Sequence, residues 1–508
     1  MNGDRACREP STALTRRAVL GAGAALLGGR ALARTSADDV ELRLTARVDE
    51  LPLDPGQRTP SRVLRYEAEQ SAGDRAAVSR NPDALLGPTL RLRRGQRLRV
   101  RFENHLGEDS IVHWHGLEVA PLNDGHPSQA VGPGQHHDYD FEVLNRAGTY
   151  WYHPHPDGRT GAQVYGGLAG LLLVSDEDER ALGLPDGPQD LPLVIQDRQL
   201  DGDGRLVYVA NAMTGLLGDR VFINGRPPQP LVVAAGSYRL RLVNGSNART
   251  YKLGWSDGSP VTVIATDGGL LATPQRLPYV MLAPGQRVEL WADFGSAPGG
   301  EEVALVSRAF AGGGMGMGMG RGMGMRMGGG GPPNGTPMPV CRFVVRGKAP
   351  RRSLPRRLAD PPPAPADRLA APPHRIAIGG GMMMRWLLNG RSFEMEDIAD
   401  NERLRLGRTE EWELSSDGGM MAMPHPIHFH GPSFRVVERT VAEGWEDLAA
   451  TVRAGLVDEG WRDTVLLMPG EVVRLQVRHQ RHAGLFLYHC HILEHEDAGM
   501  MRNFLVEE

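Results

Sequence analysis

The sequence predicts an all-β protein divided into three sandwich domains. Its 508 residues include 65 Gly and 38 Pro, which favour short strands and turns over long helices. One pattern also recurs three times: a Gly lies between alternating Arg, Leu and Val positions, and a later Pro-Gly precedes a second alternating run. Alternation of apolar and polar residues is typical of a strand with one buried face. Three copies therefore predict three related β-sandwiches.

The copies of this pattern place the domains along the chain. They comprise 92–104 with Pro133-Gly134, then 233–245 with 283–294, and then 404–414 with 468–479. We expect domains over 36–176, 188–348 and 374–508, with a stiff, Pro-rich linker at 349–373. A low-complexity Met/Gly segment at 312–335 falls late in the second domain.

The N-terminus resembles a targeting signal. Arg16-Arg17 directly precedes an apolar run over 18–29, and a small-residue cleavage pattern follows. We expect a twin-arginine signal peptide over 1–35, which would export the folded protein to the periplasm or beyond. The alternative is an ordinary secretory signal. The run is too short to cross a bilayer, so we expect no membrane span. The net charge of −4 gives no sign of nucleic-acid binding.

The three cysteines do not favour a disulfide framework. Cys7 lies in the expected signal peptide, and Cys341 lies in a strand-like run and is most simply a core residue. Cys490 stands between two histidines.

Ten of the 17 histidines fall in four short clusters, which are His113-Trp114-His115, His153-Pro154-His155, 425–431 (HPIHFHG) and 489–495 (HCHILEH). No histidine occurs between His155 and His374, so the first and third domains must share any imidazole site. Residues two apart on a strand point to the same face, and Cys490 must therefore point away from His489 and His491. One strand can thus serve two metal sites.

The residue types favour copper. Two imidazoles, a thiolate and a distant thioether are the ligands of a blue copper centre, and His425, Cys490, His495 and Met500 provide them. The other eight histidines suit a copper cluster that binds and reduces dioxygen. Zinc is the rival metal, but a closed zinc site needs about four ligands.

With these motifs, the sequence resembles the three-domain multicopper oxidases of the bacterial laccase and copper-efflux-oxidase type. The resemblance implies three cupredoxin-like Greek-key sandwiches and four copper ions. It implies that His425, Cys490, His495 and Met500 hold the type 1 copper, His113 and His428 the type 2 copper, His115, His153 and His491 one type 3 copper, and His155, His430 and His489 the other. Electrons would enter through His495, whose ring edge is exposed in the family. They would pass through Cys490 to the cluster, where dioxygen becomes water.

Two acids are candidate proton carriers. Asp124 stands nine residues after His115, and Glu496 follows His495; the family keeps acids at both places. The alternatives are a turn aspartate, since Asp124-Gly125 is a good turn dipeptide, and a solvated glutamate.

The methionines bear on the substrate, which we expect to be cuprous ion, a small phenol or both. Thioethers select Cu(I), and Met420, Met421 and Met423 directly precede His425 as a candidate cuprous site. The 312–335 segment could bind Cu(I), cover the type 1 site, or be a flexible loop without a fixed role. Arg321 and Arg326 within it would repel cations.

Other classes of function are also open. A non-catalytic copper-sequestering protein would use the methionines but would not need a cysteine joined to two sites. A cupredoxin relative without metals would not need the ligands, and a two-domain nitrite reductase would lack the third repeat. We expect a monomeric enzyme with a possible role in copper tolerance.

Overall fold

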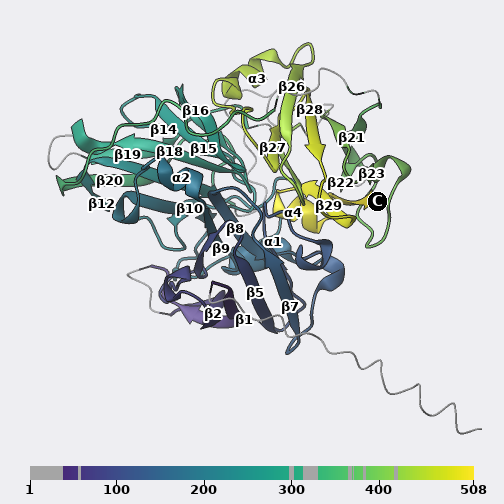
Figure 1. Ribbon diagram of the computed structural model, residues 1–508, viewed down its shortest axis with the longest axis horizontal. Coiled ribbons are helices and arrows are strands. Elements are labelled where there is room, and N and C mark those ends of the chain that lie inside the picture. The colour runs from purple at the N-terminus through teal and green to yellow at the C-terminus, as the bar shows by residue number, and fades with distance from the viewer. Residues whose placement is uncertain are drawn as a thin grey trace, which may run out of the picture.

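The fold is all-β, as predicted. The computed structural model describes residues 38–54, 59–296, 302–312, 330–363, 369, 371–381, 385–416 and 422–508, so the expected signal peptide at 1–35 lies outside them. Within these residues the strands form six sheets. The sheets group in pairs along the chain, and Figure 1 shows the three resulting lobes in purple to blue, teal, and green to yellow. The domain limits themselves remain predictions.

Each pair of sheets comes from one stretch of the chain. The first stretch orders its sheets β2 (Ser61–Ala72), β1 (Val40–Leu51), β5 (Arg97–His105), β7 (His136–Glu142), and β3 (Val78–Ser79), β4 (Thr89–Arg93), β9 (Gly170–Ser175), β8 (Gly148–Pro154), β6 (Val112–His113). The second orders β11 (Arg220–Ile223), β10 (Asp190–Arg198), β13 (Ser237–Asn244), β18 (Arg287–Asp293), β15 (Val261–Thr266), β16 (Gly269–Leu277), and β12 (Leu231–Ala235), β20 (Met338–Lys348), β19 (Glu302–Ser307), β14 (Tyr251–Trp255), β17 (Val280–Leu282). The third orders β22 (Arg385–Leu388), β21 (His374–Gly381), β24 (Thr409–Ser416), β28 (Glu471–Arg478), β26 (Arg435–Val441), and β23 (Arg403–Arg405), β30 (Met501–Glu507), β29 (Gly484–Cys490), β25 (His425–Phe429), β27 (Thr464–Leu467).

The repeated sequence pattern produces the same strand arrangement three times. The alternating run after the first Gly forms β5, β13 and β24, and the run after the Pro-Gly forms their antiparallel partners β7, β18 and β28. On its other edge each of these central strands pairs in parallel with the first strand of its unit, namely β1, β10 or β21. Gly95 and Gly407, two of the glycines that precede these strands, have left-handed backbone conformations, with φ of 83° and 80°. A residue with a side chain would be strained there.

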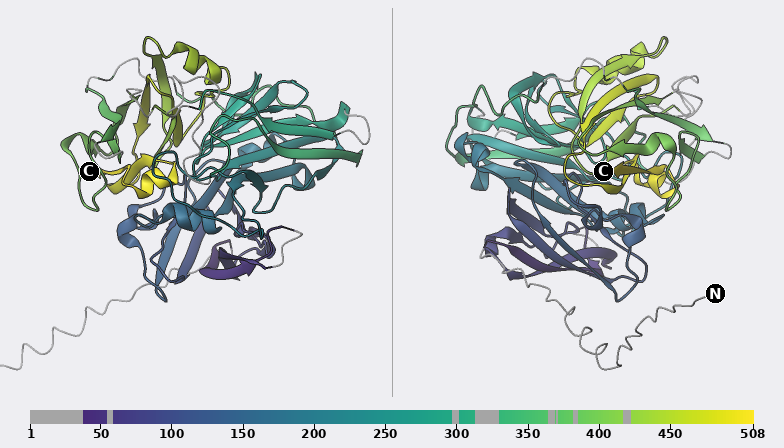
Figure 2. Two further views of the ribbon diagram at one scale, coloured as in Figure 1. Left: turned by 180° about the vertical axis from the view of Figure 1, so that it is seen from behind. Right: turned by 45° about the vertical axis from the view of Figure 1, so that its right-hand side comes forward.

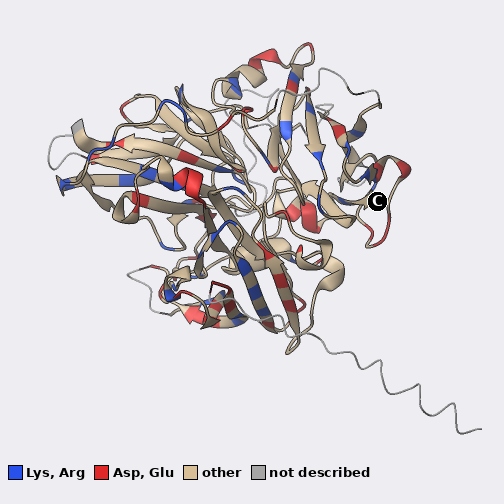
Figure 3. Cartoon of the chain, in the orientation of Figure 1, with Lys and Arg blue, Asp and Glu red and all other residues tan. Residues whose placement is uncertain are grey.

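Each sandwich encloses its own apolar core, because the alternating residues of two sheets face each other. Cys341 is buried in the middle core, as expected for a core residue. Outward positions carry charge of both signs. On the neighbouring strands β5 and β7, Arg and acidic residues lie side by side (Figure 3), and Arg101 and Asp138 form an ion pair at 2.9 Å. No helix among the described residues has the length and apolarity needed to cross a membrane.

The helices are short and mark the contacts between lobes. They are α1 (Thr160–Gly166), α2 (Glu177–Ala181), α3 (Glu446–Arg453) and α4 (Leu493–Asp497). Helix α1 of the first lobe packs against α4 of the third, near the centre of the molecule in the views of Figures 1 and 2. This contact holds the chain beyond Cys490 against the first domain.

Candidate metal centre

The four histidine clusters meet at the join of the first and third domains. Strand β6 pairs with β8 so that His113 lies opposite His153, and β25 pairs with β29 so that His428 lies opposite His489. Four further histidines lie within two residues of the ends of these strands. All eight are buried, and together they form the histidine cluster: His113, His115, His153, His155, His428, His430, His489 and His491.

The expected type 2 pair is brought together from two domains. His113 Nε2 lies 3.4 Å from His428 Nε2. The opposite nitrogen of each ring is held by a backbone carbonyl, since His113 Nδ1 donates to Asp124 O at 2.7 Å and His428 Nδ1 to Asp463 O at 2.8 Å. Each tautomer is thereby fixed with Nε2 free to bind a metal.

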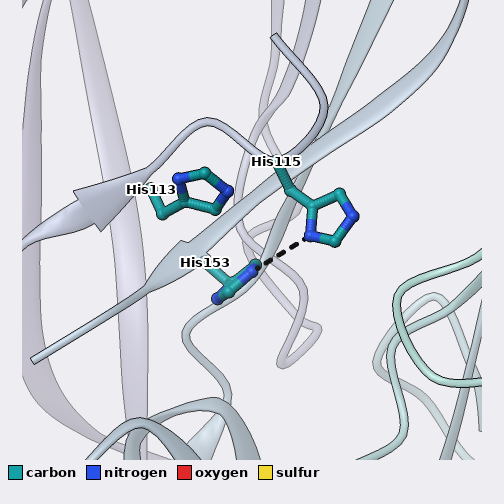
Figure 4. Close-up of side chains that lie close together, drawn as sticks. All are labelled: His113, His115 and His153. Carbon is teal, nitrogen blue, oxygen red and sulfur yellow. Dashed lines mark hydrogen bonds between the residues drawn. The ribbon is translucent and has the colours of Figure 1, made fainter. Parts of the chain in front are cut away.

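The two expected type 3 sets also assemble. His489 Nε2 lies 3.3 Å from His155 Nε2 and 3.2 Å from His430 Nε2. In the other set, His115 Nδ1 lies 3.4 Å from His153 Nε2 (Figure 4), and the His491 ring centre lies 5.0 Å from that of His115. His115 turns Nδ1, rather than Nε2, toward its neighbours.

The blue copper group, which comprises His425, Cys490, His495 and Met500, forms inside the third domain. Cys490 Sγ lies 3.5 Å from His425 Nδ1 and 3.7 Å from His495 Nδ1. Met500 is fully buried, and its carbonyl accepts from the Cys490 amide at 3.1 Å. Cys490 thus turns to the opposite side of β29 from its two histidine neighbours, as the strand geometry predicts.

The expectation of an exposed His495 is wrong for the described structure. His495 and His425 are 0% and 1% exposed. His495 Nε2 faces the carbonyl of Met213, at 3.4 Å, in a loop of the middle domain. The Trp386 indole N–H points to the same carbonyl at 3.4 Å, and its ring centre lies 5.1 Å from that of His495. A backbone turn and an indole therefore cover the side on which electrons were expected to enter.

Both candidate proton carriers lie at the histidine cluster and are almost fully buried. Asp124 Oδ2 accepts from His430 Nδ1 at 2.7 Å, and burial raises the pKa of Asp124 well above its usual value. Glu496 Oε2 lies 3.1 Å from His489 Nδ1, and Oε1 lies 3.5 Å from His155 Nε2. Asp124 does precede a turn, since Gly125 has φ of 82°, but its side chain points to the cluster. Glu496 is not solvated.

Of the three methionines in the candidate cuprous site, the structure describes only Met423, and the site itself stays a prediction. Met420 and Met421, like 313–329, lie outside the described residues. Met423 is 6% exposed and packs in the core of the third domain, which also contains Met500. Met213 was not predicted from the sequence. This residue covers His495 with its backbone carbonyl, which every residue type has, so the sequence gives no sign of it.

Sequence reasoning also missed the carboxylate that joins two of the sets. Asp463 Oδ1 lies 3.1 Å from His115 Nε2, and Arg287 of the middle domain donates to both oxygens of Asp463. Burial raises the pKa of Asp463, and the guanidinium of Arg287 opposes that rise. An aspartate before a strand and an arginine after a Pro-Gly turn are too common to indicate this contact.

The residues fit copper on chemical grounds. Ligating imidazoles must be neutral, and burial lowers the pKa of His153 to about 4 and of His425 to about 3. Within the described residues neither ring nitrogen of the buried His491 has a hydrogen-bond partner, which is costly unless a metal takes that place. Three close groups, His113-His115-His153, His155-His430-His489 and His425-Cys490-His495, keep their donor atoms within 4.8 Å of one another.

The comparisons with known proteins agree with this donor set. The family described as multicopper oxidase matches residues 65–179 and 367–508. A laccase of Haloferax volcanii is 33% identical over 80% of this chain and 70% of its own. The chain belongs to the multicopper oxidase family. It is therefore an oxidoreductase with copper as its cofactor.

Solved structures support the fold of this multicopper oxidase. The McoA multicopper oxidase of Aquifex aeolicus is 33% identical, with a TM-score of 0.75 over 92% of this chain and 96% of that chain. A Campylobacter jejuni multicopper oxidase described as a metallo-oxidase is 25% identical, with a TM-score of 0.72 over 92% and 91%. The predicted cupredoxin-type sandwiches are thus confirmed.

Proposed function

We propose that this multicopper oxidase removes single electrons from a small reductant at the blue copper group and uses four of them to reduce dioxygen to water at the histidine cluster. The reductant we favour is cuprous ion, so that four Cu⁺, four H⁺ and O₂ give four Cu²⁺ and two H₂O. The observation that carries the proposal is Cys490, whose thiolate belongs to one group while His489 and His491, its chain neighbours, belong to the other.

The copper ions, when bound, would supply the one-electron redox chemistry. His425, Cys490, His495 and Met500 would hold one ion, and the eight histidines of the cluster would hold the other three. The chain keeps water away from the first ion, because all four side chains are buried. It presents neutral imidazoles at the second site, because backbone carbonyls and Asp124 fix the tautomers of His113, His428 and His430.

Coverage of His495 supports a small reductant. The covering turn is held firmly: Asn211 Oδ1 accepts from the amides of Met213 and Thr214 at 2.9 and 3.1 Å. Glu494, next to His495 in α4, accepts from the Leu216 amide at 3.0 Å. A phenol ring cannot reach the imidazole edge while this turn and Trp386 are in place. The reductant would therefore stay outside the Met213 turn, and its electron would cross this turn to reach His495.

The described C-terminal end of the Met/Gly segment lies beside this cover, which supports a role of the segment in cuprous oxidation. The Gly331 amide, near the C-terminal end of the 312–335 segment, donates to the Leu217 carbonyl at 2.7 Å, four residues beyond Met213. The two ends of the segment also approach each other, since the Phe310 amide donates to the Gly335 carbonyl at 3.3 Å. In this proposal the thioethers of the segment bind the Cu(I) that is to be oxidised.

Asp124 and Glu496 would hold the protons that dioxygen reduction consumes. Each carboxyl contacts an imidazole of the cluster through the ring nitrogen on the outer side. Asp124, with its raised pKa, is suited to keeping a proton near neutral pH and giving it up at Oδ1, the oxygen that has no hydrogen-bond partner among the described residues.

Oxygen uptake tests the proposed substrate. The copper-loaded mature protein is offered Cu(I) and a simple methoxyphenol in parallel. We expect fast uptake with Cu(I) and slow uptake with the phenol. Fast uptake with the phenol alone would make the protein a general laccase, and no uptake with either at full copper content would favour copper sequestration.

We further propose that the protein is exported in folded form through its twin-arginine signal, with a role in copper tolerance outside the cytoplasm. Replacement of both Arg16 and Arg17 with Lys should leave the protein inside the cell. Normal export of that variant would refute the assignment.

A further inference from the structure

The middle domain supplies no imidazole, yet one of its turns closes against the histidine cluster. The turn spans 283–286, between β17 and β18. Gly285 has φ of 81°, and a Cβ there would lie 2.8 Å from His491 Cδ2 and 3.1 Å from His115 Cε1. The two imidazoles therefore pack directly against the backbone of the turn, with no room for a side chain.

The next two residues, the last of the turn and the first of β18, connect all three domains. Gln286 Nε2 donates to the Thr464 carbonyl at 3.0 Å. Arg287 Nε donates to the Thr149 carbonyl of the first domain at 3.0 Å. Its two terminal nitrogens bind both oxygens of Asp463 in the third domain, at 2.7 and 2.5 Å. Arg287 and Asp463 are 0% and 1% exposed, so this bidentate pair is shielded from water.

Asp463 in turn contacts ligands of two expected copper sites. Oδ1 lies 3.1 Å from His115 Nε2 and also accepts from the Thr464 hydroxyl at 2.9 Å. The backbone carbonyl of Asp463 accepts from His428 Nδ1 at 2.8 Å. Because Asp463 occupies His115 Nε2, the His115 ring is left with Nδ1 facing His153.

We propose that Arg287 is a positioning residue for the copper cluster: it fixes the Asp463 carboxylate, which sets the tautomer and orientation of His115. The inference rests on the proposed function, since it assumes that the eight histidines hold copper. A guanidinium binds both oxygens of a carboxylate in one plane, and a lysine ammonium cannot reproduce that geometry. Substitution of a carboxylate that is hydrogen-bonded to a ligating imidazole typically lowers metal affinity by about 10- to 100-fold. The middle domain is thus part of the cluster without contributing a ligand.

Copper content tests this role without relying on turnover. Arg287→Lys is compared with the wild type and with Arg439→Lys, which alters a largely buried arginine that is paired with Asp458 and Glu471, at 2.9 and 2.7 Å. Each full chain is freed of metal, reloaded with Cu(II) and freed of excess. We measure bound copper per chain, the blue thiolate absorption, and the type 2 signal in electron paramagnetic resonance.

We expect Arg287→Lys to keep the blue absorption but to lose at least half of the bound copper, and Arg439→Lys to keep both. Gly285→Ala, which pushes against His115 and His491, should give the same selective loss. Full copper in both Arg287→Lys and Gly285→Ala would overturn the inference, and so would an equal loss in Arg439→Lys, because that indicates general destabilisation. A wild type that binds only the blue copper would instead refute the proposed function and, with it, this inference.

Discussion

The blue copper group and the histidine cluster differ in how many domains build them. All four side chains of the blue copper group come from the third domain, between β25 and the residue before β30. The cluster takes four histidines from the first domain, four from the third, and a supporting turn from the middle one. A site made by one domain depends on the packing of one core, whereas a shared site depends on how the domains meet.

The two sites also differ in what shields them. The imidazoles of the cluster shield one another, and buried ionic groups, including the Arg287–Asp463 pair, lie around them. The blue copper group is closed on the His495 side by a loop carbonyl and an indole. Under the proposed function, the first arrangement suits a site that holds dioxygen and protons, and the second suits a site that takes electrons from a reductant at the surface.

The Cys490→Ser substitution should distinguish the two sites most sharply, because it removes a ligand of the blue copper group alone. A serine hydroxyl is a poor copper ligand, so the blue absorption should disappear and turnover should fall by about 10³-fold or more, as for one member of a unit that acts together. Absorption and oxygen uptake measure the two effects. Bound copper should fall by no more than the single blue ion, and a variant that turns over normally would contradict the electron path.

The Asp124→Asn substitution should have a smaller effect, confined to the histidine cluster. Asp124→Asn keeps an oxygen acceptor for His430 Nδ1 but cannot release a proton at neutral pH. Oxygen reduction should slow by about 10²-fold, the usual size of a general acid–base contribution, while the blue absorption stays. The rate of cluster reoxidation by dioxygen is measured in rapid mixing. Asp458→Asn, which alters a carboxylate paired with Arg439 rather than with a ligand, is the control; unchanged reoxidation in Asp124→Asn would remove Asp124 from proton transfer.

Opening the cover should affect only the blue copper group. Trp386→Leu removes the indole beside His495 and its N–H bond to Met213. Oxidation of a methoxyphenol should rise several-fold relative to cuprous oxidation, because the imidazole edge becomes accessible. Trp255→Leu, at a buried indole in the middle core, controls for loss of packing. An equal change for both reductants would show that the cover does not select between them.

The smallest effect concerns the protein freed of copper. His425 keeps a pKa lowered to about 3 by burial in the folded chain, whereas an unfolded histidine titrates near 6.5. Below about pH 6.5 the unfolded chain therefore binds more protons, and the free energy of unfolding falls as pH decreases. The Tm of the copper-free protein should drop by several degrees between pH 7 and pH 5. A constant Tm would mean that the buried imidazoles are not neutral.

Much of the fold and the ligand set could be predicted because the signals are local. The three Gly-centred alternating runs identify β5, β13 and β24 directly. The His-x-His spacing places pairs on one face of a strand, and a cysteine between two such histidines must face the other way. These statements need no knowledge of how the domains pack.

The remaining features depend on contacts between distant residues of common types. Arg287 and Asp463 are 176 positions apart, and neither stands in a distinctive motif. Met213 acts through its carbonyl, which every residue has, so no choice of side chain indicates it. The burial of His495 likewise follows from a loop of another domain, which is why an expectation taken from the family was wrong.

The most direct test of the account is the product of oxygen reduction. With Cu(I) as the reductant, an oxygen electrode gives the dioxygen consumed, a cupric assay gives the electrons removed, and a peroxide assay gives any incomplete product. The account predicts four cuprous ions oxidised per dioxygen with no hydrogen peroxide released. Two ions per dioxygen with accumulating peroxide would contradict it, because the histidine cluster would then not carry the reduction through to water.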